Sequence, residues 1–280
     1  GFYPPYLHDD GEIVPIKGNT DPDCGKTPGF ESPENREIRW DRTGKATYSQ
    51  DLFNDRMVKF IDKHRNTPFF LFHPSQLPHG PIAVPEIHPG VKDAPELTPY
   101  EKEFASMILR LDDTVGLIRE TLRKHGLLEN TIFLFSSDNG HEAYYREEGR
   151  CSGTKMDLAG NTYDNVTSRF TSEASGDVFN GNDGMAGCKF TSWEGGPRIP
   201  YFVSWPGHTE PGSVSDLFFA NFDVMPTLAD IAGLRMPEYK DGISFRPTLE
   251  GAPEAQTTHE EIVFANGLGP ALVTEEGWKI

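Results

Sequence analysis

Short, unbroken runs of apolar residues alternate along this chain with longer segments that carry the apolar spacing of a helix. The runs at residues 68–73 and 131–135 are typical of strands buried on both faces of a sheet, and residues 199–205 are expected to form a third strand. The clearest helical segment lies between the first two runs. This alternation predicts an α/β fold in which helices flank a largely parallel central sheet.

Capping residues mark where the predicted helices begin and end. The sequence T-P-Y-E at 98–101 combines an N-cap, a proline at the first helical position and a glutamate three residues after the cap, and Gly126 can end this helix. A second capping pattern, T-Y-S-Q at 47–50, opens another helix. A third helix is expected over residues 223–232. Residues 1–46 are rich in Pro, Gly and charge, so we expect mostly loop there.

The charge balance argues against nucleic acid and anionic membranes as partners. The 280 residues carry a formal net charge of -17, and a field of that sign repels nucleic acid and anionic membrane surfaces. No apolar run approaches the roughly 18 to 20 residues that a membrane span needs. Cys24, Cys151 and Cys188 are too widely spaced for a zinc cluster. One disulfide with a thiol left over, and no disulfide at all, are both compatible with these cysteines.

The apolar run at 131–135 leads directly into the sequence S-S-D-N-G-H at 136–141. Asp138 and Asn139 offer two adjacent hard oxygen ligands, which suit Ca²⁺ or Mg²⁺. His141 lies beside this pair and is a candidate substrate-binding residue. The alternative is a plain turn, because Asp, Asn and Gly are the commonest turn formers.

The run at 68–73 is also followed by a candidate functional residue, the histidine His79. His79 lies between Pro78 and Gly80, and a histidine fixed in this way can serve as a general acid. The alternative is a histidine that hydrogen-bonds a backbone carbonyl in a rigid loop. These residues alone leave both interpretations open.

The stretch G-C-K-F-T-S-W-E-G-G-P-R-I-P at 187–200 is rich in glycine, which lets backbone approach a ligand closely. Lys189 supplies a point positive charge on a long stem, or is simply solvated. Residues 141–190 form a long polar excursion, which a compact domain usually keeps for function. Residues that could line a sugar subsite, or that could only hold a loop down, are Tyr144, Tyr145, Arg146 and Trp193.

Together and in order, these stretches resemble the sulfatase family of the alkaline-phosphatase-like superfamily. The similar segments, between about residues 45 and 235, are P-F-F-L-F-H-P-S-Q-L-P-H, F-L-F-S-S-D-N-G, G-C-K-F-T-S-W-E-G-G-P-R-I-P, V-S-W-P-G and D-V-M-P-T-L-A-D-I-A-G. The resemblance implies that Asp138 and Asn139 are calcium ligands, with Mg²⁺ as the alternative metal. It also implies that His79 contacts the sulfate and the leaving oxygen, and that Lys189 holds the sulfate.

By this resemblance the parent enzyme is a sulfuric ester hydrolase that removes sulfate from a sulfated carbohydrate or an aryl sulfate. The family's nucleophile is a formylglycine made from Cys or Ser in a C/S-x-P-x-R motif, and no proline in this chain is followed two residues later by arginine. We therefore expect residues 1–280 to be part of one α/β domain, with the nucleophile segment upstream and a small β-sheet subdomain downstream. Alone, such a fragment should bind calcium weakly and turn over no sulfate ester.

Two rival functions fit the same residues. A phosphate or phosphonate monoesterase of the same superfamily shares the strand-to-Asp motif but differs at the nucleophile. A non-catalytic sugar-binding protein could be built on the same scaffold. The particular substrate and the oligomeric state are not legible in the sequence.

The resemblance also implies a secreted, periplasmic or lysosomal location and a small sulfated partner. Ligands gather at the carboxyl ends of strands in parallel sheets, so we expect four side chains to converge there. These side chains are His79, Asp138, Asn139 and Lys189.

Overall fold

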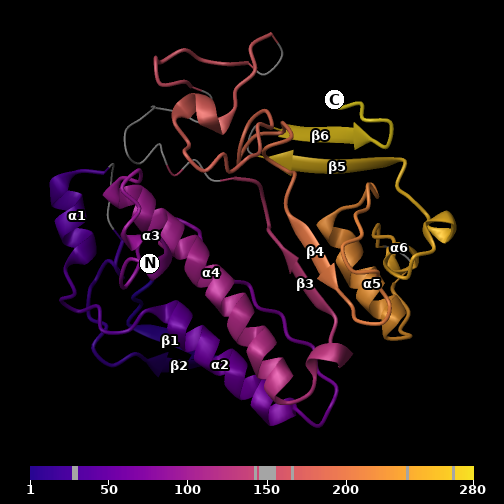
Figure 1. Ribbon diagram of the computed structural model, residues 1–280, viewed down its shortest axis with the longest axis horizontal. Coiled ribbons are helices and arrows are strands. Elements are labelled where there is room, and N and C mark those ends of the chain that lie inside the picture. The colour runs from indigo at the N-terminus through magenta and orange to yellow at the C-terminus, as the bar shows by residue number, and fades with distance from the viewer. Residues whose placement is uncertain (27–30, 142–143, 145–155, 165–166, 238–239, 267–268) are drawn as a thin grey trace. The chain divides into compact units, whose positions relative to one another are not determined.

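The computed structural model describes residues 1–26, 31–141, 144, 156–164, 167–237, 240–266 and 269–280 (Figure 1). The chain divides into two compact units. The first comprises Gly1–Leu128 and Ala143–Gly153, and the second comprises Glu129–Glu142 and Thr154–Ile280. Within the described ranges, no helix is long and apolar enough to cross a membrane.

The first unit contains a β-hairpin and a set of helices in its described part. They are β1 (Tyr6–Asp9), β2 (Glu12–Pro15), α1 (Pro33–Trp40), α2 (Ser49–His64), α3 (Pro89–Lys92) and α4 (Pro99–Lys124). The hairpin turns at Asp10 and Gly11, whose φ angles of 52° and 88° are those that a two-residue Asp-Gly turn supplies. The expectation of mostly loop over residues 1–46 is therefore wrong for this hairpin and for α1.

Helix α4 begins and ends where its sequence predicts. The Thr98 hydroxyl accepts a hydrogen bond from the backbone N–H of Glu101, and the Glu101 carboxylate accepts one from the N–H of Thr98. These reciprocal bonds satisfy two of the donors that a helix start leaves unpaired. After the last turn, Gly126 takes a φ of 68°, which only glycine adopts without strain. The prediction for this helix is confirmed.

Helices α2 and α4 pack on each other and enclose the apolar core of the first unit. Met57 and Ile61 of α2 and Leu122 of α4 are buried at its centre. The partly buried residues around them are Phe60, Phe69, Leu71, Ile118, Leu127 and Leu128. Helix α2 itself starts without the predicted capping box, because no side chain caps its first turn.

The predicted strand at 68–73 does not form. The segment is extended, yet it pairs with no other strand in the described part of the chain. Phe69 and Leu71 pack against the core, whereas Phe70 and Phe72 are 71% and 75% exposed. Successive side chains of an extended chain point to opposite sides, so an unpaired segment buries only every second one. The prediction of a strand buried on both faces is therefore wrong here.

The second unit contains four strands and two α-helices in its described part. The elements are β3 (Phe133–Ser136), β4 (Tyr201–Ser204), α5 (Val224–Ile231), α6 (Arg246–Leu249), β5 (Glu261–Asn266) and β6 (Gly269–Thr274), which together include two strand pairs. Short 3-10 helices occur along the chain at Leu128–Asn130, Ser172–Ser175, Asn221–Asp223 and Pro253–Ala255. The strands predicted at 131–135 and 199–205 are confirmed as β3 and β4, and the helix predicted at 223–232 is confirmed as α5.

Every strand pair among the described residues is antiparallel. In the pair β3–β4, Phe133 lies opposite Ser204 and Ser136 lies opposite Tyr201. The hairpins β1–β2 and β5–β6 are antiparallel as well. The largely parallel sheet that the sequence predicts is therefore not seen among these strands.

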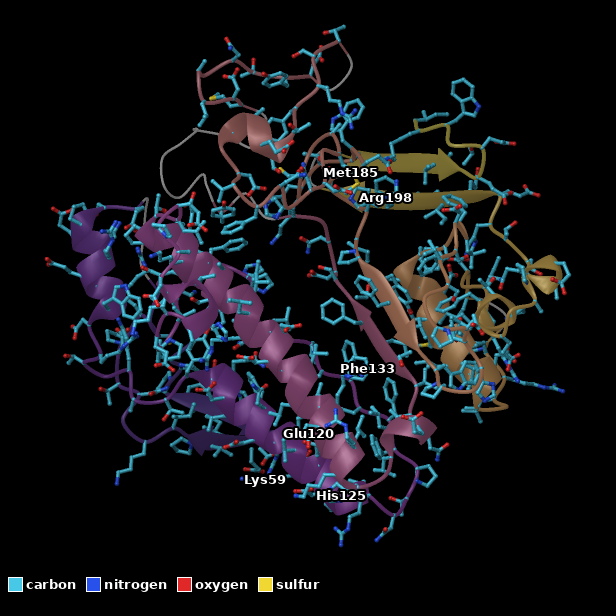
Figure 2. The ribbon with its side chains drawn as sticks, in the orientation of Figure 1. Lys59, Glu120, His125, Phe133, Met185 and Arg198 are labelled. Atoms are coloured by element: carbon cyan, nitrogen blue, oxygen red, sulfur yellow. The ribbon has the colours of Figure 1, made fainter. Side chains whose placement is uncertain are left out.

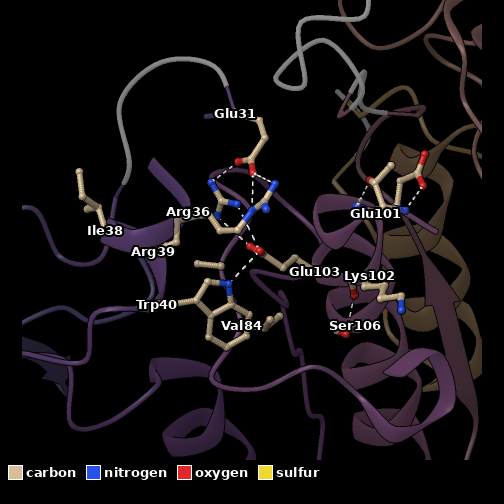
Figure 3. A network of polar contacts seen from close by, with 12 residues as sticks. Glu31, Arg36, Ile38, Arg39, Trp40, Val84, Glu101, Lys102, Glu103 and Ser106 are labelled. Atoms are coloured by element: carbon tan, nitrogen blue, oxygen red, sulfur yellow. Dashed lines mark hydrogen bonds and ion pairs between the residues drawn. The ribbon is translucent and has the colours of Figure 1, made fainter. Parts of the chain in front are cut away.

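A buried ionic network ties α1 to α4 in the first unit (Figure 3). Arg39 donates two hydrogen bonds to Glu103, from Nε at 2.7 Å and from Nη2 at 3.2 Å. The same carboxylate accepts a bond of 3.0 Å from the Trp40 indole, while Arg39 also pairs with Glu31 at 2.6 Å. Glu103 is 1% exposed and Arg39 is 7% exposed, so both charges are removed from water and depend on each other.

We expect Glu103→Ala to destabilise the protein by about 3–5 kcal/mol, because it leaves the buried Arg39 cation without its bidentate partner. The control is Glu120→Ala on the same helix, labelled in Figure 2, whose exposed carboxylate pairs with the exposed Arg123. An exposed pair of this kind contributes less than about 1 kcal/mol. Urea denaturation of both variants measures the difference. Similar small losses in the two variants would show that the network is not desolvated.

The stability of the first unit should also fall in mild acid through His73. Burial lowers the pKa of His73, and Gln50 Nε2 lies 3.2 Å from His73 Nε2, where the amide can donate to an unprotonated ring nitrogen. A lowered folded-state pKa stabilises the protein fully above about pH 6.5, and the stabilisation is lost as the pH falls from there. Thermal unfolding between pH 8 and pH 5 should show a flatter dependence for His73→Gln than for wild type. Identical pH profiles would contradict this role.

Candidate active site

Strand β3 delivers Asp138 and Asn139 to a tightly held turn in the second unit. The Ser137 hydroxyl donates to the Asn139 carbonyl at 2.9 Å. From the segment before α5, Asn221 Nδ2 donates to the Ser137 carbonyl at 3.1 Å. These bonds hold the backbone on both sides of Asp138, whose own side chain is exposed.

Gly140 brings this turn into direct contact with the glycine-rich segment at 187–196. Its N–H donates to the Gly196 carbonyl at 2.7 Å. A Cβ at position 140 would lie 2.1 Å from the carbonyl oxygen of Gly195, so any other residue would push the two segments apart. The glycine that looks like a turn former in the sequence is therefore required for close backbone approach.

Asp138 and Asn139 fit a hard divalent cation as a partial set of ligands. A carboxylate and an amide oxygen are donors that Ca²⁺ and Mg²⁺ accept, and the exposed Asp138 carboxylate has no hydrogen-bond partner among the described residues. Across those same residues, no group of three or more His, Cys, Asp and Glu side chains is arranged to hold a metal. The turn would thus supply at most two of the six to eight oxygens that calcium prefers.

Lys189 lies in a turn that is bonded to the residue after Gly140. Its N–H donates to the His141 carbonyl at 3.0 Å, and the Thr191 N–H donates to the Cys188 carbonyl across the turn, also at 3.0 Å. Phe190 follows with a φ of 72°, a left-handed conformation that costs a non-glycine residue about 1–2 kcal/mol. The ammonium of Lys189 lies 5.1 Å from the centroid of the Phe190 ring. The structure therefore brings Lys189 and the Asp138–Asn139 turn together through backbone hydrogen bonds.

The side chain of His141 faces a buried carboxylate. Its Nε2 lies 3.0 Å from Asp177 Oδ2, and the two side chains are 9% and 0% exposed. This leaves little of the ring for a substrate, and the substrate-binding role predicted for His141 stays a prediction. Sequence reasoning missed Asp177, because in D-V-F-N-G it reads only as a turn former.

Backbone amides hydrogen-bond the Asp177 carboxylate, and a closely packed glycine contacts its partner His141. The carboxylate accepts hydrogen bonds from the N–H of Phe179 at 3.0 Å and of Gly181 at 2.8 Å. Burial alone would raise the pKa of Asp177, but the hydrogen bond and charge of His141, with the Gly181 amide, hold it well below its ordinary value. A Cβ on Gly181 would lie 2.3 Å from the His141 ring, so the ring rests directly on this glycine.

His79 belongs to the first unit and sits in an exposed loop. Its Nδ1 lies 2.7 Å from the Gly80 carbonyl, and its backbone N–H donates to the Gln76 carbonyl at 3.0 Å. This contact with a backbone carbonyl is the one expected if His79 only stabilises its loop. If Nδ1 carries the proton of that bond, Nε2 is left for another partner. Because Asp138, Asn139 and Lys189 belong to the other unit, convergence of the four remains a prediction.

The residues predicted to line a sugar subsite lie in different environments. Tyr144 is 1% exposed and stacks on Phe104 of α4, with ring centroids 4.2 Å apart, so its ring packs inside the first unit and does not face a sugar. Tyr145 and Arg146 lie outside the described residues. Trp193 is partly exposed in the second unit, and its role stays a prediction.

Known proteins with similar structures share this fold. A structure from work on the metabolism of multiple glycosaminoglycans by Bacteroides thetaiotaomicron is 26% identical, with a TM-score of 0.59, and the match covers 85% of this chain and 44% of that one. Ps i-CgsB in complex with k-i-k-neocarrahexaose gives a TM-score of 0.60 at 23% identity, with 84% and 46% covered. These similarities support the alkaline-phosphatase-like fold of sulfatases.

Curated relatives agree with the structural matches. Arylsulfatase A of Bos taurus is 29% identical over 208 residues, which are 74% of this chain and 32% of the relative. The N-acetylgalactosamine-6-O-sulfatase of Bacteroides thetaiotaomicron is 28% identical over 249 residues, or 86% of this chain and 43% of the relative. The chain thus spans less than half the length of these two proteins. The family model described as Sulfatase matches residues 17–234, and the chain belongs to the sulfatase family.

Proposed function

We propose that the whole protein hydrolyses sulfate monoesters, removing sulfate from a sulfated carbohydrate or an aryl sulfate. Membership of the sulfatase family supports the reaction class, and the relatives named arylsulfatase A and N-acetylgalactosamine-6-O-sulfatase support both kinds of substrate. The chain spans only part of those relatives, so activity is assigned to the whole protein.

One observation carries this proposal. The N–H of Lys189 is bonded to the carbonyl of His141, two residues after Asn139. The lysine and the metal-ligand pair that the family pattern assigns to sulfate hydrolysis are therefore joined by backbone within one compact unit.

Each residue has a chemical role in the proposed reaction. Lys189 would hold the sulfate oxygens and offset the negative charge that gathers on them as the ester bond breaks. Asp138 and Asn139 would help to hold Ca²⁺, or Mg²⁺, and a bound divalent ion supplies further stabilisation of that charge. His79 would give a proton to the leaving oxygen, because an alkoxide is a poor leaving group near neutral pH.

The proposal extends to features of the whole protein. We place the described strands in a larger α/β domain with a largely parallel central sheet, and expect the formylglycine nucleophile of the family in the whole protein. Trp193 and His141 remain candidates for substrate contact. A secreted, periplasmic or lysosomal location and a small sulfated partner follow from the family. The net charge of -17 argues against nucleic acid as a partner.

In the whole protein, Lys189→Ala should lower kcat/KM for sulfate release by about 10²- to 10³-fold, as expected when one charge-stabilising group is lost. Its melting temperature should change little. The control is Lys59→Ala, which removes an exposed lysine of α2 (Figure 2) and should alter neither quantity. A near-normal kcat/KM for Lys189→Ala would show that Lys189 is a solvated lysine with no role in the reaction.

The substrates that the wild-type protein accepts test the reaction class itself. Release of phosphate from phosphate monoesters without release of sulfate would favour the phosphate or phosphonate monoesterase. Binding of a sulfated sugar with no hydrolysis would favour the non-catalytic protein.

Loss of His79 should affect two kinds of ester differently. If His79 donates a proton to the leaving oxygen, His79→Ala should reduce kcat/KM on a sugar sulfate by about 10²- to 10⁴-fold. An activated aryl sulfate should be affected much less, because an acidic phenol leaves as a stable anion. Equal losses on both substrates, with a lowered melting temperature, would leave His79 as a sulfate contact or a brace for its loop.

A further inference from the structure

We propose that Asp177 is a positioning residue for Lys189 and acts through His141. The inference rests on the proposed function, since it gives the buried Asp177–His141 pair a part in positioning the lysine proposed to bind sulfate. The argument depends on contacts within the second unit alone.

Asp177 is the fixed end of this connection. Its carboxylate is fully buried and accepts hydrogen bonds from the backbone N–H of Phe179 and Gly181. A carboxylate bonded in this way cannot turn to another partner without leaving amides unsatisfied, which is costly in a buried place. It therefore presents one oxygen, Oδ2, in a constant direction to Nε2 of His141 at 3.0 Å.

His141 carries this constraint to the lysine. Its ring is held between Asp177 and Gly181, whose missing Cβ leaves just enough room for the ring. With the ring held at its far end, the backbone of the residue is fixed in position, and its carbonyl accepts the N–H of Lys189 at 3.0 Å. Asp177 is thus connected to Lys189 by one polar contact of 3.0 Å, one side chain and one backbone hydrogen bond.

The lysine has little freedom apart from its side chain. Cys188 before it is fully buried, and Thr191 closes the turn by accepting from the Cys188 N–H and donating to the Cys188 carbonyl. If His141 moved, the Lys189 amide would lose its partner and the turn would move with it. A shift of about 1 Å in a group that contacts the reacting atoms can cost about 10²-fold in rate.

A second buried pair in the same unit has similar chemistry but no such connection. Asp223 Oδ1 lies 2.8 Å from His259 Nε2, and the carboxylate accepts from the N–H of Ala220 and Ile243. Among the described residues, the side-chain hydrogen bonds of Asp223 and His259 reach neither Lys189 nor His141. It is therefore a matched control for the structural cost of losing a buried carboxylate.

The test is a double-mutant cycle on the whole protein, with kcat/KM for sulfate release as the readout. Asp177→Asn should lose about 10²-fold, with the loss mainly in kcat. Combined with Lys189→Ala it should add almost nothing, because a residue that acts through the lysine has no effect once the lysine is gone. Asp223→Asn combined with Lys189→Ala should instead multiply the separate losses, as independent sites do. Multiplicative losses for Asp177→Asn as well would overturn the proposal.

A rescue experiment covers the case in which Asp177→Asn does not fold. His141→Gln keeps an N–H donor for the Asp177 carboxylate, whereas His141→Ala removes it, and both keep the backbone carbonyl. The proposal expects His141→Gln to retain most of the kcat that His141→Ala loses. Equal losses in the two variants would contradict it.

Amide hydrogen exchange at Lys189 separates this inference from the proposed function, because it requires no activity. Exchange should be slow in wild type and in Asp223→Asn, and faster in Asp177→Asn or His141→Ala. Unchanged exchange in both of the last two variants would refute the positioning role even in an active sulfatase. Faster exchange in a protein that releases no sulfate would mean that the proposed function fails while the connection is real.

Discussion

Two backbone hydrogen bonds hold the candidate site of the second unit together, and its other features depend on them. One joins Gly140 to Gly196 at 2.7 Å, and the other joins Lys189 to His141 at 3.0 Å. Both join backbone segments far apart in the sequence, and the first needs glycine, because a Cβ on Gly140 would lie 2.1 Å from the Gly195 carbonyl oxygen. A charged side chain acts well on a ligand only when its own backbone is fixed, because motion of the group costs rate.

Local signals in the sequence were sufficient wherever the interactions that form an element are local. The capping box of α4 lies within four residues, and the structure forms both of its hydrogen bonds. Strand β3 and its Asp138–Asn139 turn also occur where the apolar run and the turn formers place them. The Asp10–Gly11 hairpin is equally local, and attention to its Asp-Gly turn could have found β1 and β2.

Interactions between residues far apart in the chain could not be predicted from the sequence. The run at 68–73 is apolar up to His73, but its burial depends on whether another strand pairs with it, and none does among the described residues. Tyr144 is an aromatic in a polar segment, and only Phe104 of α4 shows that the ring is part of a core. Asp177 is the strongest case, because nothing near it in the sequence indicates that His141 is its partner.

The buried pair also bears on how a chain with a net charge of -17 can hold an anion. A carboxylate close to Lys189 would normally weaken its attraction for sulfate. Asp177 is turned instead toward two amides and His141, and it is shielded from water. Under the proposed role of Lys189, a carboxylate oriented in this way would oppose the action of the ammonium on sulfate less than a free one. The overall charge thus argues against extended anionic partners, and the proposed site would need only one fixed cation for a small anion.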